Sequence, residues 1–187
     1  MDVVSTSPAV SPPHPFDLLL QLDERVRERA PVEAADEHLS EIRGRLALRL
    51  SSWNLLFSTD DVAEIIPVPH ITAVPGVKRW LLGIANLRGR VVSVSDLRDF
   101  LIGQPAKQTS DSQIVVVHAG EWDYGLLVDG IVGMRHFGSQ QRLQSLDEVD
   151  AGLRMFVTDA FLSEEQFWLG FDAMKLLEDS RFLNAAS

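Results

Sequence analysis

The sequence contains no cysteine and a single tyrosine among its 187 residues. The missing cysteines exclude disulfides, thiolate metal sites, iron–sulfur clusters and thiol nucleophiles. Long apolar runs are also missing, and none approaches the roughly 18 to 20 residues that a membrane-spanning helix requires. Hydrophobic residues still make up 45% of the chain, enough to pack one large domain or two small ones. The sequence therefore predicts a folded, soluble protein without direct membrane insertion.

Basic residues are scarce: 17 lysines and arginines face 27 aspartates and glutamates, for a formal net charge of −10. A protein that binds nucleic acid needs a basic face for the phosphates, so this balance argues against a nucleic-acid partner. The charge is also uneven. Residues 1–44 carry nine acids and four bases, residues 45–138 carry nine of each, and residues 139–187 carry nine and four. Both acidic ends favour water or a basic partner.

The N-terminal part of the chain differs in composition from the rest. Four prolines lie among serines in residues 1–15, which we expect to form a disordered tail. This stretch has no basic residue followed by an apolar block, so it does not indicate a secretory signal, and a cytoplasmic location is expected. In residues 16–44, apolar residues at helical spacing from Phe16 to about Ala30 predict a short amphipathic helix, and an acidic linker follows.

The remainder of the chain looks like two copies of one unit. A shift of 69 positions places Trp53 on Trp122, and a shift of 76 positions places Asp96 on Asp172. Each unit consists of short β-branched and aliphatic runs separated by turn residues, and five short strands per unit suggest a small closed β-barrel made twice. Asp96 is also a candidate helix N-cap, with Gly103 as the C-terminal stop.

Residues 75–98 predict a hairpin with an exposed arginine at its tip. One strand ends near Asn86, Gly89 can adopt a positive φ in the connection, and a second strand follows. Arg88 at the tip is either a solvated turn residue or a guanidinium fork that grips a carboxylate or backbone carbonyls of a partner. Turn chemistry alone leaves both interpretations open.

Motifs for catalysis and for metal or nucleotide binding are not apparent. The five histidines show no metal-ligand spacing, and no phosphate-binding glycine loop or nucleophile elbow occurs. Adjacent carboxylates in predicted turns indicate solvation, and Asp60 and Asp129 fit turn or bulge roles. We therefore expect no catalytic residue, no metal and no cofactor. The four tryptophans are expected to be core or seam anchors: Trp53, Trp80, Trp122 and Trp168.

The segment Gly83–Leu97, GIANLRGRVVSVSDL, resembles the signature of CheW-type chemotaxis coupling proteins, with Ser93 where proline is usual. The segment from Ile114 to Gly133 is similar to the middle strands of the same family. The resemblance implies a mainly β fold of two small five-stranded SH3-like β-barrels with short helices. This CheW-like domain would span residues 45–183, with a short tail at 184–187.

The resemblance also implies a function. CheW-type proteins are non-enzymatic adaptors that couple the cytoplasmic tip of a methyl-accepting chemoreceptor to the regulatory domain of a CheA-type histidine kinase. The N-terminal extension is similar to that of the PilI branch, which belongs to the type IV pilus (twitching motility) chemosensory system. Flagellar chemotaxis CheW is the alternative within the family. A small-molecule-binding or nucleic-acid-binding β-barrel is the alternative of another class.

The family pattern implies two contact regions. Receptor binding is implied for Glu64 and for the hairpin tip, Asn86, Leu87, Arg88, Gly89 and Arg90. From the residues alone, Glu64 is a polar residue on the outer face of a half-buried strand. Kinase binding is implied along apolar strand edges, for which Val62, Ile65 and Val68 are the candidates. The second hairpin, residues 162–167, departs from the family because an acidic tip replaces Leu-Arg-Gly-Arg, so the two barrels need not bind alike.

Overall fold

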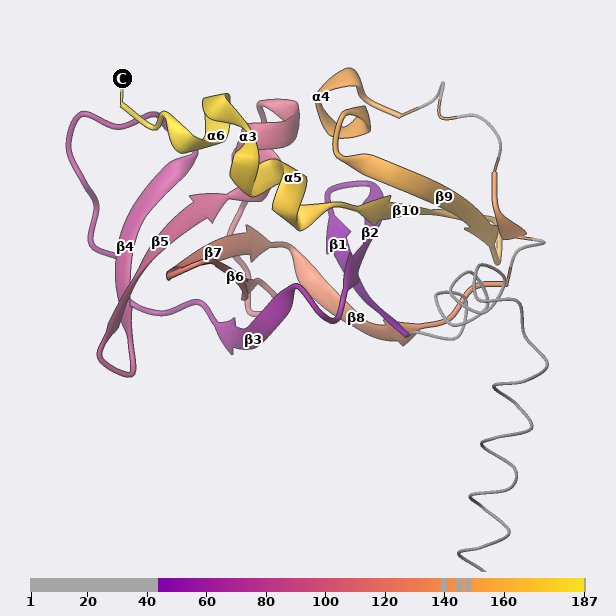
Figure 1. Cartoon of the computed structure of the whole chain (residues 1–187), viewed down its shortest axis with the longest axis horizontal. Coiled ribbons are helices and arrows are strands. Elements are labelled where there is room, and N and C mark those ends of the chain that lie inside the picture. The colour runs from indigo at the N-terminus through magenta and orange to yellow at the C-terminus, as the bar shows by residue number, and fades with distance from the viewer. Residues whose placement is uncertain (1–43, 139–140, 144–145, 147–148, 187) are drawn as a thin grey trace, which may run out of the picture. The chain divides into compact units, whose positions relative to one another are not determined.

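The computed structural model describes residues 44–138, 141–143, 146 and 149–186. Short helices pack on one side of two β-sheets (Figure 1). The strands are β1 (Arg45–Leu50), β2 (Trp53–Ser58), β3 (Val62–Pro67), β4 (Leu81–Leu87), β5 (Arg90–Asp96), β6 (Gln113–Ala119), β7 (Trp122–Val128), β8 (Gly130–Arg135), β9 (Val157–Ser163) and β10 (Gln166–Phe171). The helices are α3 (Leu97–Ile102), α4 (Ala151–Arg154), α5 (Ala173–Glu178) and α6 (Ser180–Leu183).

Each sheet takes strands from both halves of the chain. Sheet A has the order β8-β1-β2-β10-β9, and sheet B has the order β3-β6-β7-β5-β4. The expectation that each sequence unit forms its own barrel is therefore wrong, because the first two strands of one unit join the last three strands of the other. The residue pattern identifies a strand by its buried and exposed faces, and these faces do not specify which strand lies alongside.

The two sheets repeat the same register. Leu46 pairs with Phe57 in sheet A, and the positions 69 residues later, Val115 and Leu126, pair in sheet B. Each sheet also contains one parallel pair, β2 with β10 in sheet A and β7 with β5 in sheet B. The paired strands β1 and β2 of sheet A therefore correspond to β6 and β7 of sheet B, and β10 corresponds to β5.

Both sheets close on themselves. Beyond β3 the chain crosses to the opposite edge of sheet B, where Thr72 and Ile84 exchange backbone hydrogen bonds of 2.8 and 2.9 Å. Beyond β8 the chain does the same in sheet A, where Arg142 forms a bridge with Phe161. Closure satisfies edge groups that would otherwise be open to other strands. The prediction of a mainly β fold with two small five-stranded barrels is confirmed.

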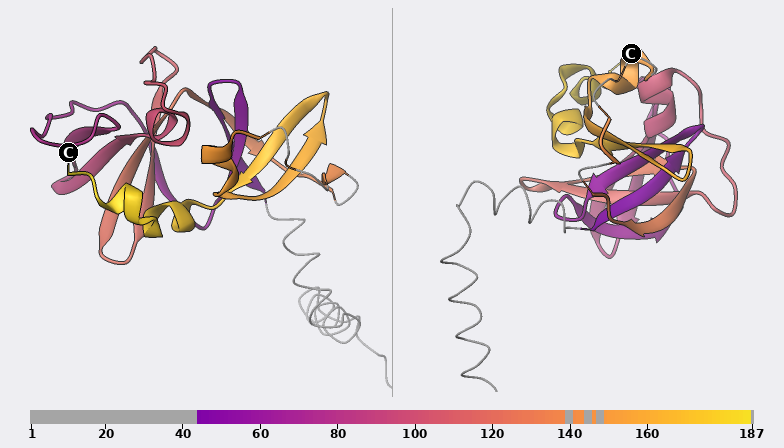
Figure 2. Two further views of the ribbon diagram at one scale, coloured as in Figure 1. Left: turned by 90° about the horizontal axis from the view of Figure 1, so that it is seen from above. Right: turned by 90° about the vertical axis from the view of Figure 1, so that its right-hand side faces the viewer.

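Side chains from both sheets and from all four helices form a large apolar core. Figure 2 shows the short helices lying along one side of the two sheets. Phe57 of β2 stacks on Phe171 of β10 with ring centroids 4.9 Å apart, and Trp80 stacks on Phe182 of α6 at 5.1 Å. Smaller clusters fill the inside of each barrel. Burial of apolar surface contributes about 25 cal/mol per Å², so the shared central core couples the two barrels into one body.

The helix ends follow the predicted capping chemistry. The Asp96 carboxylate accepts a hydrogen bond from the Asp99 amide at 3.0 Å, and α3 ends at Gly103 with a φ of 67°. Its counterpart Asp172 caps α5 by accepting from the Lys175 amide at 2.8 Å. Asp96 is buried within the packed body, and this burial raises the pKa of its carboxyl group.

The tryptophans do not all lie in the core. Trp168 is buried inside the sheet A barrel, and Trp53 and Trp80 are half-buried against the central core. Trp122 is 67% exposed, so its prediction as a core or seam anchor is wrong. It is the first residue of β7, at the end of the strand that extends past the central core.

The predicted N-terminal tail, amphipathic helix and acidic linker cover residues 1–44, and all of these except Gly44 lie outside the described residues. Across residues 44–186, as far as they are described, no helix is long and apolar enough to cross a membrane.

Candidate partner-binding site

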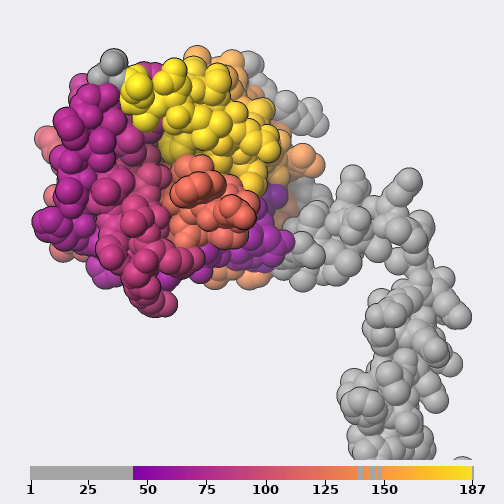
Figure 3. Space-filling model, turned by 60° about the vertical axis from the view of Figure 1, so that its left-hand side comes forward, coloured from indigo at the N-terminus to yellow at the C-terminus, as the bar shows by residue number. Residues whose placement is uncertain are grey.

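The β4–β5 hairpin ends in a tight two-residue turn. Leu87 pairs with Arg90, and the two residues between them have positive φ values, 51° for Arg88 and 87° for Gly89. Two consecutive positive φ values match the twist of a β-hairpin and favour glycine or asparagine. The Asn86 side-chain oxygen accepts a hydrogen bond from the Gly89 amide at 2.8 Å, which fixes the turn. The hairpin protrudes at the lower edge of the body in Figure 3.

Arg88 and Glu64 meet at this tip. One Arg88 Nη donates to Glu64 Oε1 at 2.7 Å. The Arg88 side chain is 81% exposed, whereas that of Glu64 is 25% exposed. The structure therefore brings together two residues that lie 24 positions apart in the sequence, both predicted to contact the receptor. Glu64 is not on the outer face of its strand, because it pairs with Val116 of the sheet B core and its neighbours Ala63 and Ile65 are the exposed residues.

A second charged group is centred on Asp123 of β7. Arg90 Nη1 is 2.5 Å from Asp123 Oδ2, and His118 Nδ1 is 2.7 Å from Asp123 Oδ1. Only 6% of the Asp123 side chain is exposed, whereas Arg90 and His118 are more than half exposed. The buried Asp123 carboxylate thus contacts the exposed side chains of Arg90 and His118. Sequence reasoning missed Asp123 and His118 because β6 and β7 supply them to a hairpin built from β4 and β5.

The three candidate kinase contacts differ in exposure. Ile65 is 38% exposed on β3. Val62 is half-buried and packs against the central core, and Val68 is half-buried against the sheet B core. Only Ile65 of these three presents a large part of its side chain to a partner.

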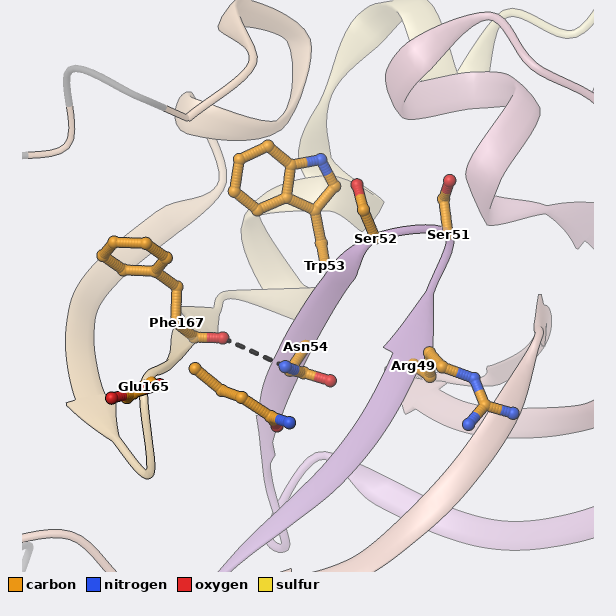
Figure 4. Close-up of a pocket in the computed structure, with 8 residues that line it drawn as sticks. Arg49, Ser51, Ser52, Trp53, Asn54, Glu165 and Phe167 are labelled. Atoms are coloured by element: carbon orange, nitrogen blue, oxygen red, sulfur yellow. Dashed lines mark hydrogen bonds between the residues drawn. The ribbon is translucent and has the colours of Figure 1, made fainter.

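The counterpart hairpin of sheet A has a different surface. Glu164 and Glu165 form its turn with φ values of 54° and 61°. Next to it, an open groove of about 360 Å³ lies between this hairpin and the β1–β2 turn (Figure 4). Trp53 and Phe167 line the groove, and the Asn54 side-chain amide donates to the Phe167 carbonyl at 3.2 Å. Acidic charge thus replaces the arginines of the sheet B tip.

The hairpin tip offers an exposed cation on a fixed turn. An exposed guanidinium can form paired hydrogen bonds to a carboxylate or to backbone carbonyls, and the turn beneath it is fixed. Among the described residues, no three histidine, aspartate or glutamate side chains are grouped so that they could hold a metal ion.

Comparison with known proteins supports a family assignment. Over 172 residues the chain is 31% identical to Protein PilI of Pseudomonas aeruginosa, which covers 92% of this chain and 96% of that protein. It is 28% identical over 96 residues to chemotaxis protein CheW of Thermotoga maritima, covering 51% of this chain and 63% of that protein. The crystal structure of scaffolding protein TtCheW from Thermoanaerobacter tengcongensis has the same fold, with a TM-score of 0.64 at 20% identity over 74% of this chain and 89% of that chain. Residues 46–181 match the CheW-like domain model, and the chain belongs to the family of CheW-like scaffold proteins.

Proposed function

We propose that this protein is a non-enzymatic adaptor that couples a methyl-accepting chemoreceptor to a CheA-type histidine kinase in a type IV pilus chemosensory system. Its membership of the CheW-like family supports the adaptor role. The match to Protein PilI supports the pilus system, because it covers 92% of this chain, whereas the match to the Thermotoga maritima CheW covers 51%. This role needs the protein in the cytoplasm, where the receptor tips and the kinase are.

The single observation that carries the receptor assignment is the exposed Arg88 guanidinium on a fixed turn. Its 81% exposure leaves most of the group open to a partner, while Glu64 holds it from one side at 2.7 Å. A surface ion pair of this kind contributes little to stability, about 1 kcal/mol or less. The arginine is therefore better explained by recognition than by folding.

An adaptor has to hold two partners at a fixed spacing. The two barrels share a central core and exchange strands, so a force on one barrel is transmitted to the other without an intervening linker. Such a body can carry a receptor on sheet B at the β4–β5 hairpin and a kinase at a second surface. We place the kinase contact at Ile65 on β3, with the half-buried Val62 and Val68 supporting the shape of that edge.

The test is a reconstitution from three purified parts. The full chain is mixed with a receptor cytoplasmic tip fragment, with a CheA-type regulatory domain, and with both. We expect each pair to associate with a Kd on the order of micromolar, and a ternary complex to form only when this chain is present. Kinase domains from a pilus system and from a flagellar system are compared to separate the two pathways. Binding to neither part, or turnover of a substrate by the purified chain, would contradict the adaptor role.

A further inference from the structure

A small pocket lies where the C-terminal residues meet sheet B. Its volume is about 190 Å³, and side chains of β4, β5, β7 and α6 line it. Leu183 and Ala185 form part of the lining, and the Ala185 carbonyl accepts a hydrogen bond from the Lys78 amide at 2.8 Å. Figure 3 shows the C-terminal residues, in yellow, lying against sheet B. The end of the chain is therefore fixed beside the pocket.

Three aromatic side chains form walls of this pocket. Trp80 and Phe182 are stacked with ring centroids 5.1 Å apart, and the Tyr124 ring lies 6.4 Å from that of Phe182. Phe182 belongs to the central core, and Trp80 and Tyr124 pack against it, so the walls are held from behind. Aromatic rings attract a further ring through offset-stacked or edge-to-face contacts. The walls therefore favour a flat aromatic occupant.

The pocket also contains hydroxyl groups that have no protein partner. Ser93, Ser95 and Tyr124 line it, and Ser95 is only 2% exposed. None of these three hydroxyls forms a hydrogen bond with the residues that the structure describes. A buried hydroxyl without a partner costs free energy, and a bound polar atom would remove that cost. An occupant with one hydrogen-bonding group thus fits better than a purely apolar one.

The matching positions of sheet A are occupied by large side chains. In the parallel pairing of β5 with β7, Ser93 and Ser95 hold the places that Leu169 and Phe171 hold in the pairing of β10 with β2. Leu169 and Phe171 are 1% and 3% exposed, and both belong to the central core. Sheet B thus has two small polar side chains where sheet A has a leucine and a phenylalanine. This difference leaves space in sheet B that a second molecule can fill.

We propose that this pocket binds a small molecule with one aromatic ring and a hydroxyl group, of which phenol is the simplest example. A cavity of about 150 Å³ with apolar walls holds benzene, so a pocket of about 190 Å³ has room for one ring with a small substituent. The ring packs against Trp80 and Phe182, and its hydroxyl forms a hydrogen bond with Ser95. The pocket shares no residue with the Arg88 hairpin tip, and the inference does not depend on the proposed function.

The test is a titration of the isotope-labelled full chain with phenol, followed by the NMR shifts of backbone amides. We expect saturable shifts at Ser93, Ser95 and Tyr124, with a Kd of about 1 mM or lower for so small a ligand. Two probes of similar size separate the contributions. Toluene has the ring without the hydroxyl, and cyclohexanol has the hydroxyl without the aromatic ring. Each is expected to bind about fivefold more weakly than phenol.

Two variants test the pocket itself. Ser93→Leu introduces the residue of sheet A, and it should abolish the phenol-induced shifts without lowering the melting temperature, because the leucine fills existing space. Its control is Ser163→Leu, the same change at a half-buried serine of β9 outside the pocket, which should bind phenol like the wild type. Ser95→Ala keeps the space and removes the hydroxyl, so phenol should bind this variant only as weakly as toluene binds the wild type.

Several results would overturn the inference. The pocket is a packing gap and no ligand site if phenol causes no saturable shift in the wild type. Unchanged phenol binding by Ser93→Leu would place the bound molecule elsewhere. Equal affinities for phenol and toluene, or unchanged phenol binding by Ser95→Ala, would remove the hydroxyl from the ligand class. If Ser93→Leu does not fold, Ser95→Ala and the two comparison probes decide the matter without it.

Discussion

Arg88 occupies a backbone conformation that costs an arginine free energy. Its φ of 51° is in the left-handed region, where side chains with a Cβ are disfavoured by roughly 1 kcal/mol. The surface ion pair of this side chain contributes a similar or smaller free energy, so arginine gives this position little net stability. The guanidinium protrudes from the tip without stabilising it, as expected of a residue that contacts a partner.

Replacing Arg88 by glutamate tests this residue. Arg88→Glu is expected to abolish receptor binding while the far-UV circular dichroism and the melting temperature stay nearly unchanged, because the tip is exposed. The control Arg49→Glu makes the same charge reversal at a half-exposed arginine of sheet A and should leave receptor binding intact. Unfolding of Arg88→Glu would instead assign a structural role to Arg88.

The ion pair with Glu64 can be separated from recognition. In the double variant Glu64→Arg with Arg88→Glu, the two charges are exchanged and the ion pair can form again. We expect this variant to melt like the wild type and still not to bind the receptor fragment. Recovery of binding would mean that the pair orders the hairpin and that the partner does not contact the guanidinium.

Gly83 is the glycine on which closure of sheet B depends. Its φ is 144°, and a Cβ at this position would collide with the Thr72 carbonyl, which accepts the Ile84 amide at 2.9 Å. Gly83→Ala is therefore expected to lower the free energy of unfolding by about 2 kcal/mol or more, measured by urea denaturation. Gly133→Ala is the control, because its φ is 125° and its Cβ would meet nothing within 4 Å. Equal losses in both variants would show that φ alone, and not the contact with Thr72, sets the cost.

Sequence reasoning succeeded where a residue's role depends on its own neighbours in the chain. Gly89 and Asn86 were identified from turn chemistry, and the structure places them in a hairpin turn. Trp122 was misassigned and Asp123 was missed, because exposure and ion pairing depend on strands that are distant in the sequence. The predicted receptor contacts came from the family resemblance, and the ion pair between Arg88 and Glu64 became visible only in the structure.

At the scale of elements, residues that are close in the sequence determine helix caps and strands. They do not determine which strands pair with one another. Asp96 and Asp172 cap their helices as predicted, since an N-cap needs only an amide two or three residues on. The exchange of strands between the units is not visible in the residue pattern, because β2 has the same apolar face whether it adjoins β3 or β10.

The turn between β2 and β3 places a carboxyl group beside the cap of α5. Burial raises the pKa of Asp61, and the nearby charges of Asp172 and Asp60 raise it further. When the pKa of a carboxyl group is higher in the folded than in the unfolded state, stability falls as the pH rises from the ordinary value of 3.8 through the raised value. At neutral pH the ionised Asp61 therefore destabilises this turn.

Asp61→Asn should relieve that cost. We expect its melting temperature at pH 7 to exceed that of the wild type by about 1–2 °C, since surface changes are usually within 0.5 kcal/mol. This difference in melting temperature should shrink as the pH falls below 4, because the protonated wild-type Asp61 is then uncharged, like the asparagine. The exposed Glu121→Gln removes the same charge elsewhere, and an equal gain there would point to net charge as the cause. Thermal melts at both pH values decide between the two.

At the scale of the whole molecule, strand exchange makes the two barrels interdependent. Sheet A needs β1 and β2 from the first half of the chain and β8, β9 and β10 from the second, and sheet B needs the complementary set. The central core likewise draws residues from both halves. A scaffold built in this way cannot lose one barrel without losing the other, which would suit the proposed adaptor role, in which two binding surfaces stay at one spacing.

This interdependence predicts how the chain behaves when it is cut. Residues 1–107 and 108–187, divided in the exposed loop between α3 and β6, each hold only part of both sheets. Each fragment alone is expected to lack a cooperative thermal transition and to show weak β-sheet circular dichroism. Mixed during refolding, the two should recover the β-sheet spectrum and bind the receptor fragment, because every strand then finds its partner. A cooperative melt from either fragment by itself would show that one unit can build a barrel alone, and that the exchange is not needed for folding.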